Sequence, residues 1–62
     1  MVEKWAANVF AELKLLGITQ REFAKECGYS EEYVCQVLRG KRYTPQAKET
    51  ITETLRRLKA EA

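Results

Sequence analysis

The stretch GITQREFAKECGYSEEYVCQVLRG, from Gly17 to Gly40, carries the clearest structural signals in this 62-residue chain. It contains two short segments with an apolar face, and each is bounded by residues that start or stop a helix. Thr19 and Glu22 have the spacing of a capping box, in which each side chain satisfies a backbone amide at the start of a helix. Gly28 follows, and glycine readily adopts the left-handed conformation that ends a helix. The stretch therefore predicts a helix over about 20–27, a tight turn and a second helix.

This next helix is expected over about 31–39. Ser30 precedes it, and serine is a favoured N-cap residue, while Gly40 follows it and stops it. The inward face is expected from apolar residues that recur at steps of three and four. These residues are Val34, Val37 and Leu38, whereas Glu31, Glu32, Cys35, Gln36 and Arg39 point elsewhere.

Helices are also expected on both sides of this central stretch. In residues 2–16, one apolar stripe is formed by Val2, Trp5, Ala6, Val9, Leu13 and Leu16. Pro45 suits the first position of a last helix, with Thr44 as its cap. On the outer face of that helix, Glu53 and Arg57 have the spacing of an i,i+4 ion pair.

No segment alternates between apolar and polar residues over a useful length, so strands are not expected. The fold class is therefore all-α, a compact four-helix domain that occupies residues 1–62 as one unit. The predicted core includes Val9, Leu13, Phe23, Ala24, Val34, Leu38, Ile51 and Leu55.

Composition narrows the classes of function. The net charge of +2 is too mild to indicate nucleic acid by itself, but residues 31–62 hold seven basic and five acidic side chains, and Arg39, Lys41 and Arg42 cluster within four residues. Histidine is absent and the two cysteines lack a metal-ligand spacing, so no metal site, cofactor, small-molecule substrate or enzyme activity is expected. There is no apolar run of membrane-spanning length and no signal-peptide pattern, so we expect a cytoplasmic protein without a membrane partner.

Two short helices joined by a glycine-containing turn form a helix-turn-helix unit. The small Ala24 suits the close crossing of the two helices, and Gly28 suits the turn. The string Thr19-Gln20-x-x-Phe23-Ala24, then Gly28-Tyr29-Ser30, then Tyr33-Val34-Cys35-x-Val37-x-x-Gly40 resembles the lambda-repressor-like, Cro-type (XRE-like) helix-turn-helix family. This resemblance implies sequence-specific binding of double-stranded DNA by a small transcriptional regulator of phage or mobile-element type, with the third helix in the major groove.

The resemblance also implies which residues meet the DNA. Backbone contacts are expected from Thr19, Gln20, Tyr33, Arg39, Lys41 and Arg42. Base contacts are expected from Glu31, Glu32 and Gln36, because a carboxylate accepts a hydrogen bond from cytosine N4, and glutamine can bond adenine N6 and N7 together.

The acids at 31 and 32 depart from the family, which more usually has polar or basic residues there. Two interpretations of them remain open: they read bases, or they only complement the helix dipole, worth about 0.3–1 kcal/mol each. For this reason we keep an alternative from another class, a protein-interaction module, such as an anti-repressor or accessory factor, that uses the same scaffold and binds DNA weakly or not at all.

The sequence also departs from the family in its number of helices, and this difference bears on the oligomeric state. Family members commonly carry a fifth helix that helps them dimerise, whereas this sequence predicts four. We therefore expect a weak homodimer whose interface contains the apolar residues Trp5, Leu15 and Leu58. Two copies are expected to bind a palindromic DNA site.

Overall fold

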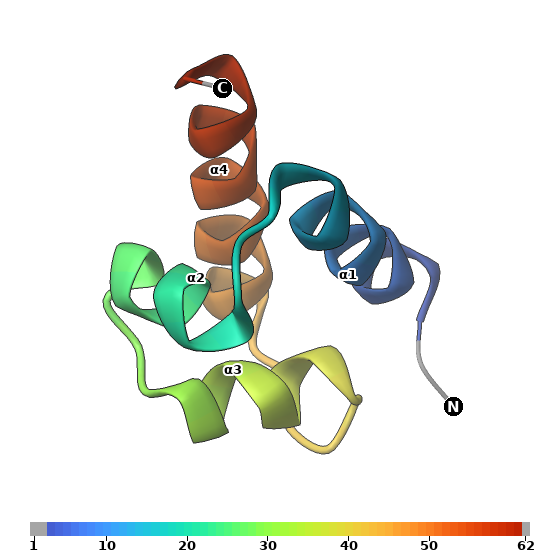
Figure 1. Ribbon diagram of the computed structural model, residues 1–62. Coiled ribbons are helices and arrows are strands. Elements are labelled where there is room, and N and C mark those ends of the chain that lie inside the picture. Colours follow the sequence, from blue (N-terminus) through green and yellow to red (C-terminus); the bar gives the residue numbers. More distant parts are fainter. Residues whose placement is uncertain (1–2, 62) are drawn as a thin grey trace.

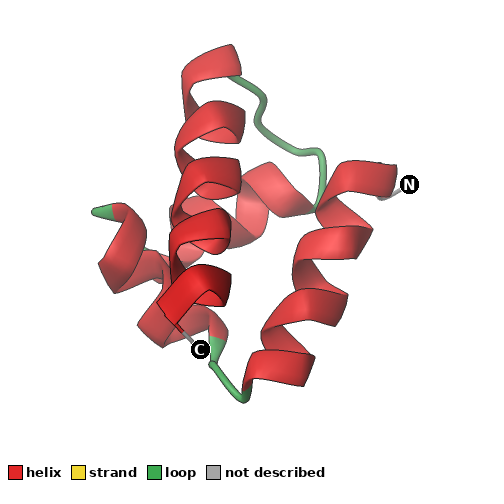
Figure 2. Ribbon diagram, turned by 90° about the horizontal axis from the view of Figure 1, so that it is seen from above, coloured by secondary structure: helices red, strands yellow, loops and turns green. Residues whose placement is uncertain are grey.

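Four helices form where the capping residues and apolar spacing predict them. They are α1 (Lys4–Leu16), α2 (Gln20–Cys27), α3 (Glu31–Leu38) and α4 (Pro45–Glu61). The computed structural model describes residues 3–61, and within this range the ordered elements are all helices, with no strand. Figure 2 shows these helices from above, joined by short loops. The all-α prediction is confirmed.

Two helix boundaries differ from their predicted positions. α1 begins at Lys4 rather than at residue 2, and Val2, which was assigned to its apolar stripe, lies outside the described residues. α3 ends at Leu38 instead of residue 39, and Arg39 is its C-cap. The chain then turns at Gly40, whose φ is +81°. The start of α4 is as predicted, since the hydroxyl of Thr44 accepts a hydrogen bond from the Ala47 amide at 3.1 Å.

The turn between α2 and α3 is built by local hydrogen bonds. Gly28 has φ +82°, and this left-handed residue lets the Tyr29 amide donate to the carbonyl oxygen of Ala24 at 3.0 Å. Ser30 then caps α3, because its hydroxyl oxygen accepts from the Tyr33 amide at 3.1 Å. Three residues therefore end one helix, reverse the chain and start the next.

The helices pack around a single cluster of apolar side chains. α2 packs on both α3 and α4, and α1 packs on α4. Figure 1 shows α3 as the lowest element, with α2 above it and α4 rising away from them. All eight predicted core residues are buried, and the cluster adds three more; its members are Ala6, Val9, Leu13, Phe23, Ala24, Val34, Val37, Leu38, Ala47, Ile51 and Leu55.

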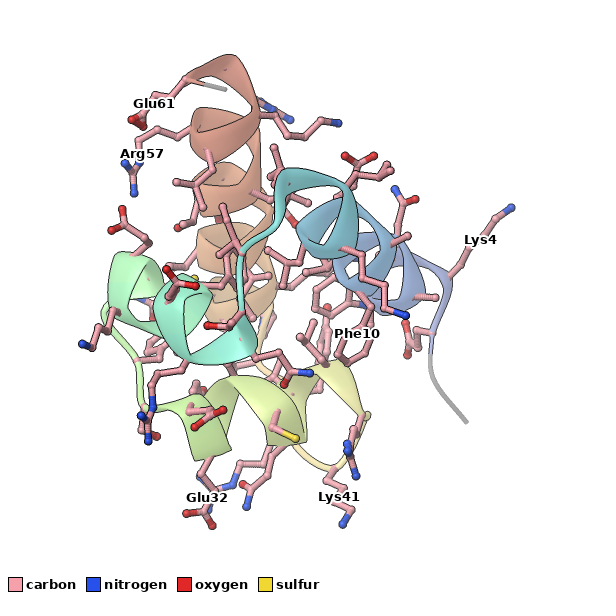
Figure 3. The ribbon with its side chains drawn as sticks, viewed as in Figure 1. Lys4, Phe10, Glu32, Lys41, Arg57 and Glu61 are labelled. Atoms are coloured by element: carbon pink, nitrogen blue, oxygen red, sulfur yellow. The ribbon has the colours of Figure 1, made fainter. Side chains whose placement is uncertain are left out.

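The ion pair predicted between Glu53 and Arg57 does not form. Glu53 pairs instead with Arg56 at 3.4 Å, and the Arg57 guanidinium lies 2.8 Å from Glu26 and 3.1 Å from Glu61. Glu26 is on α2, so Arg57 links α4 to a helix far away in the sequence. Figure 3 shows Arg57 and Glu61 together at the C-terminal end of α4.

Within the described residues, no helix combines the length and the apolar character that crossing a membrane requires.

The first prediction concerns Leu38, which is fully buried where α3 meets the core. Replacing it by alanine removes buried methyl groups and leaves a cavity, so Leu38→Ala should lower the free energy of unfolding by about 2–5 kcal/mol. The matched control is Leu15→Ala, because Leu15 is 82% exposed and should cost less than about 0.5 kcal/mol. Urea denaturation of both variants measures the two costs. Equal costs would show that the inward face of α3 is wrongly assigned.

The second prediction concerns Gly28. A Cβ built at this position meets no atom within 4 Å, so a larger side chain would not clash with its surroundings. It would destabilise the protein only through the strain of a left-handed backbone. Gly28→Ala should therefore lower the stability by about 1–2 kcal/mol, and Gly28→Asn should cost less, because asparagine tolerates this conformation. Thermal melting of both variants provides the test. An alanine variant as stable as the parent protein would mean that the turn does not need its positive φ.

Candidate nucleic-acid interface

The outward face of α3 carries the residues that the sequence predicts as base contacts. Glu31 and Glu32 are exposed at its start, and Gln36 is half-buried one turn further on. The residues on the opposite face are buried, which fixes how α3 is rotated about its axis. Figure 3 shows Glu32 extending from the lower side of α3, away from the rest of the protein. The helix thus presents a short polar surface on which Glu31 and Glu32 are exposed and Gln36 is half-buried.

The loop after α3 supplies the positive charge next to this surface. Its three basic residues, Arg39, Lys41 and Arg42, are all exposed. The amides of Lys41 and Arg42 donate to the carbonyl oxygen of Gln36 at 2.9 and 3.3 Å, so the last turn of α3 holds the loop in place. In Figure 3, Lys41 extends from the same side of the protein as Glu32. The basic residues are therefore positioned by backbone hydrogen bonds and not only by proximity in the chain.

Aromatic side chains fix one of these basic residues more closely. The Cζ atom of Arg42 lies 5.9 Å from the centroid of the Tyr33 ring, within the range of a cation–π contact. The Tyr33 ring in turn packs edge-on against Tyr29, with centroids 4.8 Å apart. Tyr33 is half-buried, as predicted from the sequence. Arg42 is consequently tied by its side chain as well as by its backbone.

A hollow of about 200 Å³ lies between α3 and this loop. It is lined by Ser30, Glu32, Tyr33, Gln36 and Arg42. Carboxylate and amide groups line part of it, and a guanidinium lines another part. It therefore offers both hydrogen-bond acceptors and donors to a molecule that approaches α3.

The start of α2 borders the same region through a contact that the sequence analysis missed. The Nε atom of Arg21, in the first turn of α2, lies 3.8 Å from a carboxylate oxygen of Glu31. Both side chains are more than half exposed, so solvent screens the pair and it contributes little to stability. The contact instead orients the Glu31 carboxylate toward α2. The residues are ten apart in sequence, so no i,i+4 spacing signals the pair.

Thr19 and Gln20 lie at the same end of α2. The amide and the hydroxyl of Thr19 both donate to Glu22, at 3.1 and 3.0 Å, and the hydroxyl oxygen accepts from the Glu22 amide at 3.1 Å. The predicted capping box is therefore present. Since both donors of Thr19 are engaged, a phosphate contact by this residue would have to replace one of these hydrogen bonds. Gln20 is half-buried next to it.

Three titratable side chains of the described residues have shifted pKa values, and each shift has a structural cause. The amide of Thr19, and then its hydroxyl, lower the pKa of the Glu22 carboxyl by hydrogen bonding to its charged form. Burial raises the pKa of the Cys27 thiol, against the opposing hydrogen bond with Thr54. The hydrogen bond to Glu26 is the main reason that the pKa of Arg57 is raised. None of these groups lies on the outward face of α3.

Cysteines and acids are the residue types of this sequence that could ligate a metal ion. Cys27 and Cys35 are free thiols, each partly exposed. Among residues 3–61, no three side chains of the metal-binding types come together in a group that could hold an ion.

Comparison with known protein families, with curated proteins and with solved structures finds no match to this chain.

Proposed function

We propose that this protein binds double-stranded DNA in a sequence-specific manner and acts as a small Cro-like transcriptional regulator. The observation that carries the proposal is the polar outer face of α3, with Glu31 and Glu32 exposed, flanked by a basic loop that backbone hydrogen bonds hold against its last turn. A B-DNA major groove is about 12 Å wide and accommodates one α-helix. Eight residues of α-helix rise about 12 Å, which suits contact with a few base pairs.

In this proposal α2 and α3 act as a helix-turn-helix unit. The first helix lies across the DNA backbone, and α3 enters the groove with its outer face toward the bases. Three observations support this assignment: the packing of α2 on α3, the short turn at Gly28, and the burial of Val34 and Leu38 on the inner face of α3.

The residues on this surface have two roles in the proposal. Glu32 and Gln36 meet base edges in the groove, and Glu31 does so at its margin, beside Arg21. The phosphate contacts come from the rest of the surface, namely from Thr19, Gln20, Tyr33, Arg39, Lys41 and Arg42. The acids weaken general attraction to DNA but reject every base that lacks a hydrogen-bond donor.

The exposed acids also favour a second candidate function. Glu31 and Glu32 place negative charge at the start of α3, and a polyanion gains nothing from that charge alone. An anti-repressor or accessory factor could use the same surface to bind a basic protein. This alternative predicts weak or absent binding to duplex DNA.

Selection of bound sequences from a pool of random duplexes separates the two candidates. The DNA-reading proposal predicts enrichment of one motif, with affinity that falls steeply as salt rises. If no sequence is enriched at low salt, the protein-interaction alternative replaces it.

The third prediction concerns the basic loop. Lys41→Ala and Arg42→Ala should each weaken binding to all duplexes about equally and reduce the slope of log K against log salt by about 1. Arg56→Ala is the matched control. This substitution also removes one positive charge, but it removes it from α4, where Arg56 pairs with Glu53. Fluorescence anisotropy at several salt concentrations measures the slopes. A change in sequence preference with an unchanged slope would rule out the phosphate role.

The fourth prediction concerns stoichiometry. A single small module covers only part of an operator, so specific binding should use two copies on half-sites about 34–36 Å apart. Of the apolar residues expected to form the dimer, Leu15 is 82% exposed, whereas Trp5 and Leu58 pack partly against the core. Such a small apolar area favours a monomer or a weak dimer in solution.

Sedimentation of the free protein, and then of its complex with the selected duplex, tests this stoichiometry. The expected complex contains two proteins per palindromic duplex. A one-to-one complex at saturation, on a site without dyad symmetry, would contradict it.

A further inference from the structure

Tyr33 lies where α3 meets the basic loop, in contact with a second tyrosine and with an arginine. Its ring packs edge-on against Tyr29, with the ring centroids 4.8 Å apart and the ring planes at 61°. The Cζ atom of Arg42 lies 5.9 Å from the centroid of the Tyr33 ring. Both tyrosines are half-buried and pack against the core. The Tyr33 ring is therefore held by its surroundings, and it can in turn hold the exposed side chain of Arg42.

Arg42 differs from the other basic residues of the loop in these contacts. It borders the hollow that Tyr33 and Gln36 also line, and its amide donates to the carbonyl oxygen of Gln36 at 3.3 Å. Of the cation–π contacts within residues 3–61, this is the one that the loop makes. Arg39 and Lys41 are exposed as well, but neither has an aromatic partner of this kind in the described part of the chain.

The hydrogen-bond donors of Arg42 remain available to a ligand. The ion pairs among the described residues involve other basic side chains, and none involves Arg42. A cation–π contact arises from the attraction between a positive charge and the electron density of a ring face, so it occupies no hydrogen-bond donor. The N–H groups of a guanidinium match the oxygen atoms of a phosphate in their geometry. The ring contact is therefore compatible with a phosphate contact.

An arginine side chain loses rotational freedom when it binds a phosphate, and this loss lowers affinity. A contact that already restricts the side chain in the free protein reduces the loss on binding. Resting on the DNA-binding function proposed above, we propose that Tyr33 is a positioning residue for Arg42, because its ring holds the guanidinium where it meets a DNA phosphate. The ring thus strengthens binding to every duplex through Arg42, independently of a phosphate contact by the Tyr33 hydroxyl.

A comparison of phenylalanine with leucine at position 33 isolates the ring. Tyr33→Phe is the reference, because it removes the hydroxyl but keeps the ring. Tyr33→Leu also removes the ring, and it should bind a mixed-sequence duplex about two- to fivefold more weakly than Tyr33→Phe, as expected for a cation–π contact at an exposed site. Fluorescence anisotropy measures both affinities, and circular dichroism establishes that each variant is folded.

Two arginine backgrounds show whether the ring acts through Arg42. When Arg42→Ala is also present, Tyr33→Phe and Tyr33→Leu should bind equally, since there is no guanidinium for the ring to hold. Arg39→Ala is the matched control, because it removes the same charge beside the same helix but leaves the contact between Tyr33 and Arg42 intact. In that background the difference of about two- to fivefold should remain.

A variant of nearly unchanged shape separates the electron density of the ring from its packing. Trifluorophenylalanine, placed at position 33 by chemical synthesis of the 62-residue chain, resembles phenylalanine in shape. Its fluorine atoms withdraw electron density from the ring face that attracts a cation. This variant should bind more weakly than Tyr33→Phe when Arg42 is present, and equally when Arg42→Ala is present. The comparison decides the matter if Tyr33→Leu does not fold.

Proton NMR of the free protein tests the contact without DNA. The δ-methylene protons of Arg42 should be shifted upfield by the ring current in the parent protein and in Tyr33→Phe, but not in Tyr33→Leu. Absence of this shift in the parent protein would overturn the inference. So would equal or tighter binding by Tyr33→Leu when Arg42 is present, or a difference that persists in Arg42→Ala, and each of these results leaves DNA binding intact. If the parent protein binds no duplex at low salt, both the inference and the proposed function are refuted.

Discussion

The position of α3 relative to α2 follows from the left-handed conformation of Gly28. This conformation ends α2 and allows the chain to reverse within three residues, so that Ser30 can cap α3. The reversal brings Val34 and Leu38 against α2 and the core, where both are fully buried. Because an α-helix has 3.6 residues per turn, burying this face turns the remaining residues of α3 outward. The polar surface of α3 is thus a direct consequence of how its apolar face is buried.

The distribution of charge around α3 matters more than the small net charge of the chain. Acids occupy its first turn, where they also complement the helix dipole. Basic residues follow its last turn, where the carbonyl oxygen of Gln36 holds the loop through the amides of Lys41 and Arg42. In the function proposed here, α3 obtains its affinity for DNA from one end and its selectivity from the other. This division explains how exposed acids can be compatible with a polyanionic ligand.

The features that could be predicted from the sequence are local ones. Caps at Thr19 and Ser30, the turn at Gly28 and the apolar stripes depend on residues within four positions of one another, and the structure contains each of them. The end of α3 was misplaced by one residue, because amides of the following loop take the carbonyl oxygen of Gln36.

Contacts between helices could not be predicted in this way. The pairs Arg21–Glu31 and Glu26–Arg57 depend on how α2 meets α3 and α4, and residue spacing does not encode that geometry. The Glu32–Gln36 hydrogen bond does have a readable i,i+4 spacing. Each of the two side chains can also bond a base, so the spacing alone does not predict that they bond to each other.

In the proposed function, the outer face of α3 and its basic loop form the surface that binds DNA. Titration of ¹⁵N-labelled protein with its selected duplex, followed by amide chemical shifts, shows which residues form that surface. We expect the largest changes on residues 31–42 and on the first turn of α2, and little change in the residues around the hollow between α1 and α4, including Asn8 and Thr52. Changes confined to α1 and α4, or no changes at low salt, would contradict this proposal.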